Sequence, residues 1–231
     1  MCDLEICFLP VQWRKLDGAR LRASACAVID VIRATSTIVT ALAHGASGVR
    51  PVASVDEALA LKEKYPAVLL AGERGGQALP EFDLDNSPED FTTGRVEGRR
   101  IILTTTNGTQ ALAACNGARA VVTASLLNLD AVAARLLKIG PPWIIVCAGR
   151  DGEFGMDDAV AAGALAEALG REHGLVSLYR SVRNELEATL LRSGAGRELL
   201  RVGLDKDVPF CANLNLFSIV PTLGADGVLR G

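Results

Sequence analysis

The amino-acid sequence predicts an α/β protein: a layered sheet flanked by helices, built from two similar β-α-β-α-β halves, with a more helical C-terminal part. Two observations support this prediction. Short apolar runs alternate with segments in which apolar residues recur at helical spacing, and this alternation is typical of a sheet covered by helices. A hydrophobic content of 49% over 231 residues supplies enough apolar surface for a sizeable core. We therefore expect a single domain over residues 1–231.

The expected elements follow one another along the chain. Short apolar runs bounded by polar or turn residues predict strands buried on both faces, at Ala25–Ile29, Gly48–Val52, Ala67–Ala71, Arg100–Thr104, Ala118–Thr123 and Trp143–Ala148. Apolar residues at i, i+3 and i+4 predict helices, at Thr35–Ala43, Val55–Lys64, Gly108–Cys115 and Leu129–Lys138. The last third predicts a long helix from about Asp157 to Leu169, more helix through Tyr179–Val202 and an edge strand at Leu216–Val220.

The two halves, about 25–76 and 99–152, repeat the same order of signals. In this comparison Gly45 corresponds to Gly117, and Gly72 corresponds to Gly149. The pattern favours an internal duplication, which would bring equivalent loops of the two halves to one cleft. The alternative is that any two β-α-β-α-β units share such glycines and turns.

Composition and charge exclude several classes of protein. Lys and Arg number 24 against 27 Asp and Glu, which gives a formal charge of −3, and aromatic residues make up only 4%. This balance argues against nucleic acid as a partner. No apolar run is long enough to span a membrane and the N-terminus has no signal-peptide pattern, so we expect a cytoplasmic protein. With two His and no C-x-x-C pair, a zinc site is not expected.

A first candidate site follows the strand at Ala25–Ile29. Asp30 stands at the carboxyl end of this strand, where α/β proteins keep residues that face ligands. Arg33 offers a planar guanidinium for phosphate or sulfonate oxygens, and Ser36 and Thr37 add hydroxyl donors at the start of a helix. The alternative is a structural helix cap, which explains the hydroxyls but not the Asp and Arg beside them.

A second candidate site occupies the corresponding place in the other half. Hydroxyls, an amide and a flexible glycine precede a helix there, at Thr105, Thr106, Asn107, Gly108 and Thr109. Together with the first site, this loop predicts a second pocket for anions, which could take the other end of one substrate. Taken alone, this motif is a weak signal, and the alternative is another helix cap.

Two further loops carry candidate residues. Glu73 and Arg74 lie between glycines after a strand and could bind a cation and an anion side by side, although a solvated turn explains them equally well. Asn86 and Ser87 precede Pro88, so they are either site residues or a turn before a short helix.

The last candidate cluster contains Arg150, Asp157 and Asp158. Acidic residues in the first turn of a helix complement its dipole, so a structural role is a serious alternative. Two neighbouring carboxylates are costly unless they are solvated or bound to a cation. Because oxygen ligands without a His or Cys cluster are those of hard cations, the pattern favours Mg²⁺ over zinc.

Taken together, these motifs resemble the 2-phosphosulfolactate phosphatase family along nearly the whole chain. The resemblance rests on Asp30-Val-Ile-Arg-Ala-Thr-Ser-Thr, Gly72-Glu-Arg-Gly-Gly, Asn86-Ser-Pro, Thr105-Thr-Asn-Gly-Thr, Asn128, Ala148-Gly-Arg, the acidic pair 157–158 and Asp207-Val-Pro-Phe-Cys211. It implies an α/β fold particular to the family and a Mg²⁺-dependent phosphatase. The implied reaction converts (R)-2-phospho-3-sulfolactate to (R)-3-sulfolactate and phosphate, in the archaeal route to coenzyme M.

On this hypothesis, Asp30, Arg33, Glu73 and Arg74 are catalytic and some of Asp30, Glu73, Asp157 and Asp158 bind Mg²⁺. The residues expected to bind substrate are Ser36, Thr37, Asn86, Ser87, Thr105, Thr106, Asn107, Gly108, Thr109 and Arg150. Attack by water and a covalent phosphoenzyme both remain open. Alternative functions are a phosphatase of another small phosphorylated hydroxy-acid or a non-catalytic anion-binding protein. A homodimer is a default expectation.

Overall fold

The computed structural model describes residues 3–231, which form a mixed α/β fold. Within these residues, ten strands form one sheet in the order β1-β8-β2-β7-β9-β10-β3-β6-β4-β5. The strands are β1 (Leu4–Cys7), β2 (Ala25–Ile29), β3 (Gly48–Pro51), β4 (Leu69–Arg74), β5 (Gln77–Ala78), β6 (Arg100–Thr104), β7 (Ala120–Ala124), β8 (Trp143–Cys147), β9 (Thr222–Leu223) and β10 (Leu229–Arg230). The expected layered α/β architecture is therefore confirmed.

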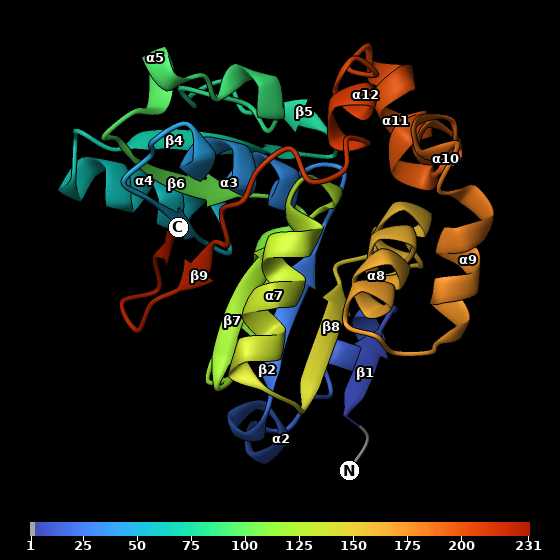
Figure 1. Ribbon diagram of the computed structural model, residues 1–231. Coiled ribbons are helices and arrows are strands. Elements are labelled where there is room, and N and C mark those ends of the chain that lie inside the picture. The colour runs from blue at the N-terminus through green and yellow to red at the C-terminus, as the bar shows by residue number, and fades with distance from the viewer. Residues whose placement is uncertain (1–2) are drawn as a thin grey trace.

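Helices flank the sheet, and the last third of the chain is mostly helical (Figure 1). They are α1 (Pro10–Trp13), α2 (Gly18–Ala23), α3 (Ala34–Ala43), α4 (Val55–Lys64), α5 (Thr93–Val96), α6 (Gly108–Ala114), α7 (Leu129–Ile139), α8 (Met156–Ala168), α9 (Gly174–Val182), α10 (Leu186–Arg192), α11 (Gly194–Val202) and α12 (Asp207–Cys211). Short 3₁₀ turns are η1 (Pro88–Asp90) and η2 (Leu126–Asn128). Among residues 3–231, no helix combines the length and the apolar character that crossing a membrane requires.

All six predicted strands and all four predicted helices in the first two thirds of the chain are present, with small shifts at their ends. The predicted long helix is α8, and the region Tyr179–Val202 contains the end of α9 together with α10 and α11. The strand β1 was not predicted. Its four residues are too few to show a periodic pattern, and it is a strand because it pairs in parallel with β8.

The prediction of an edge strand at Leu216–Val220 is wrong, because this segment is a loop. Its backbone bonds to the η2 turn instead of to a strand: the Phe217 amide donates to the Leu127 carbonyl at 2.9 Å. The chain joins the sheet just afterwards, in the short antiparallel pair β9 and β10. This pair lies in the middle of the sheet, where β9 contacts β7 and β10 contacts β3.

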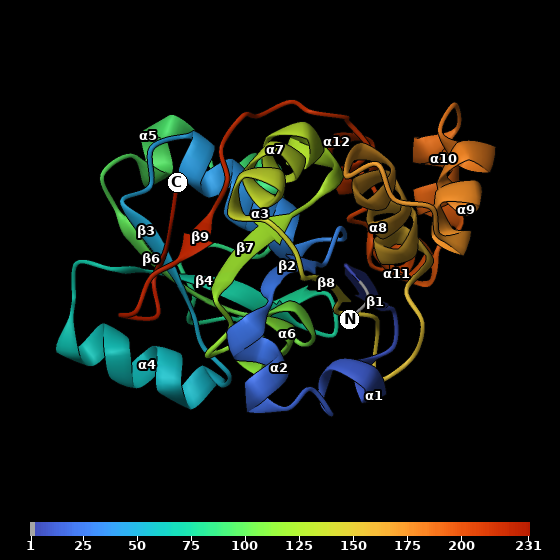
Figure 2. The same ribbon diagram turned by 60° about the horizontal axis from the view of Figure 1, so that its bottom comes forward.

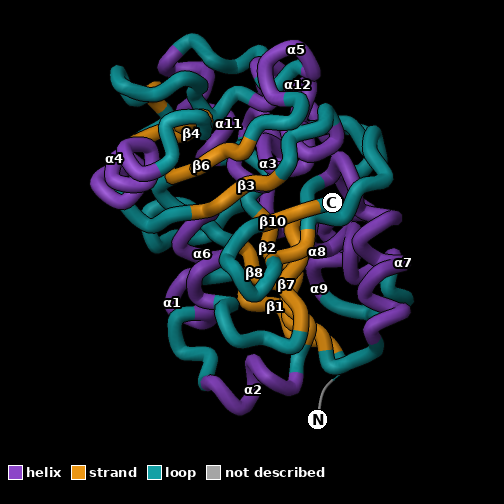
Figure 3. Tube along the Cα trace, turned by 90° about the vertical axis from the view of Figure 1, so that its left-hand side faces the viewer, coloured by secondary structure: helices purple, strands orange, loops and turns teal. Residues whose placement is uncertain are grey.

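The two predicted halves are interleaved in the sheet. Strand β2 lies between β8 and β7, and β6 lies between β4 and β3. The first strand of each half therefore pairs with the second and third strands of the other half. Figure 3 shows these two groups of strands with β10 between them. The duplication itself stays a prediction.

The two groups run in opposite directions, because the pairings β7–β9, β9–β10 and β10–β3 are all antiparallel. Within each group the neighbouring long strands are parallel. A sheet of this width twists strongly, and Figure 1 shows β4 and β6 lying crosswise to β7 and β8.

Three apolar cores hold these layers together. The first contains Ile29 of β2 and the buried face of α8. The second contains Val28 of β2 and Ile101 of β6, so it packs between the two groups of strands. The third contains Ile102 of β6 beneath α4, the helix at the lower left of Figure 2. Alternation of side chains along β2 and β6 thus places successive residues in different cores.

Asn128 fastens the C-terminal segment to the sheet. It is fully buried, its Oδ1 accepts from the Ser125 amide at 2.9 Å, and its Nδ2 donates to the carbonyls of Thr123 at 3.3 Å and Ile219 at 3.0 Å. Each of these backbone groups loses its partner if the amide is removed.

We expect Asn128→Ala to lower the free energy of unfolding by about 2–4 kcal/mol, because buried polar groups without partners cost about 1–3 kcal/mol each. Urea unfolding followed by circular dichroism measures the change. The matched control is Asn116→Ala at an exposed position, for which a change within about 0.5 kcal/mol is expected. Equal effects of the two substitutions would contradict the role given to Asn128.

Candidate active site

The carboxyl ends of β2, β4, β6 and β8 meet at one cleft with about 660 Å³ of space, part of it open to solvent. Its walls come from both groups of strands and from α11. The lining residues are Asp30, Ile32 and Arg33 after β2; Glu73, Gly75 and Gly76 at β4; Asn86; Thr105, Thr106 and Asn107 after β6; Gly149, Arg150, Asp151, Gly155, Asp157 and Asp158 after β8; and Ala195, Glu198 and Leu199 of α11.

Three carboxylates, Asp30 after β2 and Asp157 and Asp158 in the first turn of α8, are buried together: Asp30 is 7% exposed, Asp157 4% and Asp158 3%. Backbone amides hold two of them in place. Asp30 Oδ1 accepts from the Ala34 amide at 3.2 Å. The two oxygens of Asp158 accept from the amides of Val31 and Gly149, each at 2.9 Å. Asp158 therefore ties the loop after β8 to the loop after β2.

Burial raises the pKa values of these carboxyl groups, since desolvation disfavours the charged form. The pKa of Asp30 rises to about 7, first through burial and then through the charge of Asp157, while the Ala34 amide opposes the rise. Burial likewise raises the pKa of Asp157 to about 6 against the backbone amide of Ile32. The pKa of Asp158 is raised well above its ordinary value by burial and then by the other two carboxylates.

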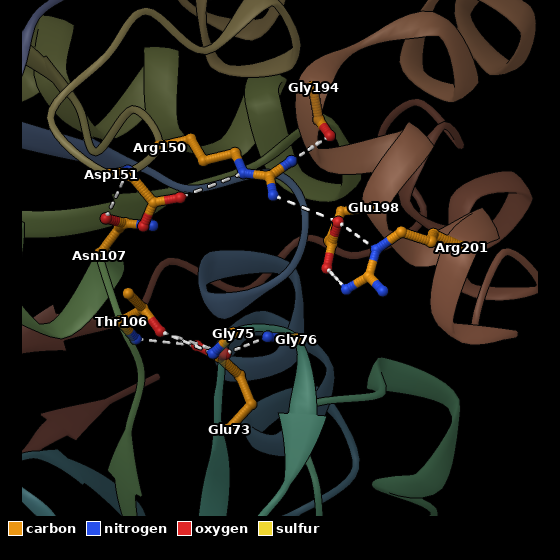
Figure 4. Close-up of polar contacts among 10 residues, drawn as sticks. All are labelled: Glu73, Gly75, Gly76, Thr106, Asn107, Arg150, Asp151, Gly194, Glu198 and Arg201. Atoms are coloured by element: carbon orange, nitrogen blue, oxygen red, sulfur yellow. Dashed lines mark hydrogen bonds and ion pairs between the residues drawn. The ribbon is translucent and has the colours of Figure 1, made fainter.

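Glu73, at the end of β4, joins the two loops on the other side of the cleft. Its Oε1 accepts from the Thr106 amide at 2.8 Å, and its Oε2 accepts from the Gly76 amide at 2.7 Å and from the Thr106 hydroxyl at 3.2 Å. Figure 4 shows these contacts. With both oxygens engaged, Glu73 fixes the shape of the cleft wall.

Arg33 lines the cleft but is already paired with an acid. Its Nη1 lies 2.7 Å from Asp207 Oδ2, with the two side chains 2% and 0% exposed, and its Nη2 donates to the Gly76 carbonyl at 3.1 Å. Asp207 also accepts from the Ser87 hydroxyl at 2.5 Å. Asp207 belongs to a motif on which the family resemblance rests, yet the residue types around it gave no sign of a buried ion pair.

Arg150 extends across the cleft from the loop after β8 to α11. Its guanidinium contacts the Gly194 carbonyl, the Asp151 carboxylate at 3.4 Å and Glu198 Oε2 at 3.5 Å. The Asp151 amide in turn donates to Asn107 Oδ1 at 3.2 Å. Figure 4 shows this chain of contacts. Since its side chain is 35% exposed, Arg150 is the cleft's accessible cation.

Asn86 lines the cleft and is 3% exposed. Its Oδ1 is buried without a hydrogen-bond partner. Because an unpaired buried polar atom is costly, this side chain is suited to a hydrogen bond with a ligand.

Six of the predicted site residues do not line the cleft: Arg74, Ser36, Thr37, Ser87, Gly108 and Thr109. Arg74 donates to the carbonyl of Glu73 and the hydroxyl of Thr104, at 2.7 and 2.8 Å. Ser36 donates to the Val31 carbonyl and Thr37 to the Asn86 carbonyl, each at 2.8 Å.

The hydroxyls of Ser36 and Thr37 and the guanidinium of Arg74 therefore lie outside the cleft and hold its loops in place through hydrogen bonds. Thr109 exchanges hydrogen bonds with Thr105, and Gly108 lies directly behind Asp30, where a Cβ atom would be 2.6 Å from Asp30 Oδ2. Sequence reasoning missed Asp151, Gly155 and Glu198, whereas Gly75, Gly76 and Gly149 line the cleft as members of the motifs Gly72-Glu-Arg-Gly-Gly and Ala148-Gly-Arg. Glu198 carries no local signal, since it resembles any charged residue on a helix surface.

The chemistry of the donors fits a hard divalent cation, although no group of three or more His, Cys, Asp and Glu side chains within residues 3–231 is arranged to hold a metal. Glu73 and Asp158 use both oxygens for backbone or hydroxyl donors. The Asp30 carboxylate accepts a hydrogen bond from the Ala34 amide at Oδ1, and Asp157 lies beside it. Mg²⁺ commonly takes one or two carboxylates, with water and substrate oxygens completing its shell.

Comparisons with known proteins agree on one family. Residues 14–226 match the family described as 2-phosphosulpholactate phosphatase. A protein of Deinococcus radiodurans is 46% identical over 207 residues, covering 85% of this chain and 86% of the relative. One of Thermotoga petrophila is 43% identical over 202 residues (85% and 87%). One of Carboxydothermus hydrogenoformans is 39% identical over 225 residues (94% and 92%).

Each of these relatives is named "Probable 2-phosphosulfolactate phosphatase". The match covers the strands and loops that build the cleft, from β2 to the segment after α12. The chain belongs to the 2-phosphosulfolactate phosphatase family, whose name denotes phosphoric monoester hydrolases.

Proposed function

We propose that the protein is a Mg²⁺-dependent phosphatase that hydrolyses (R)-2-phospho-3-sulfolactate to (R)-3-sulfolactate and phosphate. Membership of the family and the names of the relatives support the reaction and the substrate. The need for a cation is supported by the charge of the cleft, which is the observation that carries this proposal.

The cleft is strongly acidic. Six acidic residues line it, Asp30, Glu73, Asp151, Asp157, Asp158 and Glu198, against two arginines. Of these two, Arg33 is already neutralised by Asp207. The proposed substrate carries a phosphate, a carboxylate and a sulfonate, which such a surface repels. Asp30 and Asp157 would hold a divalent cation there, which would supply positive charge for the phosphate.

In this proposal Asp30 and Asp157 would hold Mg²⁺, which supplies a Lewis acid and positive charge for the phosphoryl oxygens. The protein's own groups position the substrate. Arg150 offers an accessible guanidinium for a second anionic group. Asn86 Oδ1 is a buried acceptor without a partner, so it suits a hydrogen-bond donor such as a water molecule and not an anionic oxygen of the substrate. Positioning and charge stabilisation of this kind account for most of the catalysis of phosphoryl transfer.

The remaining residues act by holding these groups in place. The buried pair of Arg33 and Asp207 fixes Ser87 and the Gly76 carbonyl. We further propose that the single domain arose by duplication, which is supported by the interleaved pairing of β2 and β6 with the strands of the opposite half.

A panel of phosphate monoesters tests the function. We expect release of inorganic phosphate from phosphosulfolactate, measured colorimetrically, to be abolished by EDTA and restored by MgCl₂. Phosphoglycolate and 3-phosphoglycerate, which lack the sulfonate, are the comparison substrates. Faster hydrolysis of these two would indicate that the substrate is another phosphorylated hydroxy-acid. If no monoester released inorganic phosphate, the proposed catalysis would be refuted.

We expect Asp30→Asn to lower kcat/KM on the order of 100-fold or more, because it removes the charge of a proposed cation ligand. Its melting temperature should not fall, since Asp30 is a buried carboxylate next to Asp157. The matched control is Asp226→Asn, which alters an exposed ion pair with Arg230, and activity should be unchanged there. A joint loss of stability and activity in Asp30→Asn would instead indicate a structural role.

The raised pKa of Asp30 also predicts a dependence of stability on pH. Its folded-state pKa of about 7 lies above the ordinary value of 3.8 for an aspartate, so the proton favours the folded state. In EDTA, the stability of the wild type relative to Asp30→Asn should therefore be greatest below about pH 4 and fall as the pH rises to about 7. Urea unfolding of both proteins across this range measures it, and a constant difference would contradict the shift.

A further inference from the structure

Arg150 donates from Nη1 to the Gly194 carbonyl and has two further contacts with carboxylates, which an anionic ligand could replace. Its Nη2 lies 3.5 Å from Glu198 Oε2 and its Nε lies 3.4 Å from Asp151 Oδ2. Both distances are long for charge-assisted hydrogen bonds, which are close to 2.7–2.9 Å at their best. Because the Arg150 side chain is also 35% exposed, neither carboxylate holds it firmly.

Glu198 has a second and closer cationic partner on the side away from the cleft. Its Oε1 accepts from Arg201 Nη2 at 2.5 Å, and its Oε2 accepts from Arg201 Nε at 3.0 Å. Figure 4 shows the Glu198 carboxylate between the two guanidinium groups. The hydrogen bonds of Arg201 also lower the pKa of Glu198, so this carboxylate stays ionised.

This arrangement lets Glu198 give up Arg150 at little cost. If an anion binds Arg150, the Glu198 charge remains paired with Arg201 on the same helix. Within residues 3–231, Glu198 forms ion pairs with Arg150 and Arg201 only. If Arg201 were removed, Arg150 would be its one remaining cationic partner. The Glu198 carboxylate would then compete more strongly with the ligand.

We infer that Glu198 is a positioning residue, a counter-ion of Arg150 that an anionic group of the substrate displaces and that Arg201 then retains. The inference rests on the proposed function and extends it to α11, which has no other assigned part in the site. The displacing group is a carboxylate or a sulfonate, the substrate's anions other than the phosphate, because the phosphate is assigned to the cation at Asp30 and Asp157. A planar guanidinium suits the paired oxygens of such groups.

The test measures binding of the product (R)-3-sulfolactate by isothermal titration calorimetry. We expect Glu198→Gln to tighten binding by about two- to fivefold, since a partly exposed ion pair contributes up to about 1 kcal/mol. Arg201→Ala should weaken binding, because Glu198 then has Arg150 as its cationic partner and competes more strongly with the ligand. Inorganic phosphate, titrated with MgCl₂ present, should bind with nearly the same affinity to all variants. The melting temperature of each variant shows that it is folded.

A double-mutant cycle separates this exchange from a general change of charge. When Glu198 is already Gln, Arg201→Ala should have no further effect, whereas a general field effect predicts that the two changes add. Glu167→Gln is the matched control, because Glu167 pairs with Arg180 at 2.6 Å outside the cleft. It should leave sulfolactate binding unchanged.

The inference is overturned by additive effects, by equal effects of Glu167→Gln and Glu198→Gln, or by unchanged sulfolactate binding in Glu198→Gln. It is overturned as well if sulfolactate binds neither the wild type nor Glu198→Gln. Failure of the proposed function has a different signature, the absence of phosphate release by the wild type from every monoester. In that case the cycle with sulfolactate still decides whether Glu198 and an anion compete for Arg150.

Discussion

The structure depends above all on burying three carboxylates, Asp30, Asp157 and Asp158, at one point where two loops meet. Their burial is costly without compensation. Backbone amides of Val31, Gly149 and Ala34 supply part of it, and this requirement dictates the shape of both loops. The amides leave part of the cost of burial and the mutual repulsion of the carboxylates uncompensated, and these two effects, burial first, raise the pKa values of Asp30 and Asp158. A cation bound in this cleft would reduce the electrostatic repulsion among these buried carboxylates, which otherwise lowers the stability of the folded protein.

A second buried charge sets the relative positions of the surrounding segments. Asp207 of α12 contacts Arg33 at the start of α3 and the Ser87 hydroxyl, while Arg33 also reaches the Gly76 carbonyl. A buried ion pair is weak evidence for added stability. Its geometry is specific, however, because the guanidinium and the carboxylate each satisfy two partners. We interpret the pair as the contact that aligns the C-terminal helices with the strand loops and so places α11 over the cleft.

Much of the fold and part of the site could be predicted from the sequence. The buried strands have continuous apolar runs, and Asp30, Glu73, Thr106 and Arg150 stand where these runs end. The predictions failed where the signal was not local. Leu216–Val220 has the composition of a strand but bonds to the η2 turn. Ser36 and Arg74 have suitable chemistry, yet their donors are used by nearby carbonyl and hydroxyl oxygens.

By itself, the sequence determined the longer strands and helices of the first two thirds of the chain and which polar residues stand at their ends, because periodicity and turn chemistry act between neighbours. The tertiary structure decided which of these ends share a cleft. The two groups of parallel strands run in opposite directions, so their carboxyl ends meet through the twist of the sheet and the central core between the groups. It also brought Glu198 and Asp207 to the site from distant helices. Such contacts depend on long-range packing, which leaves no pattern in the residues around them.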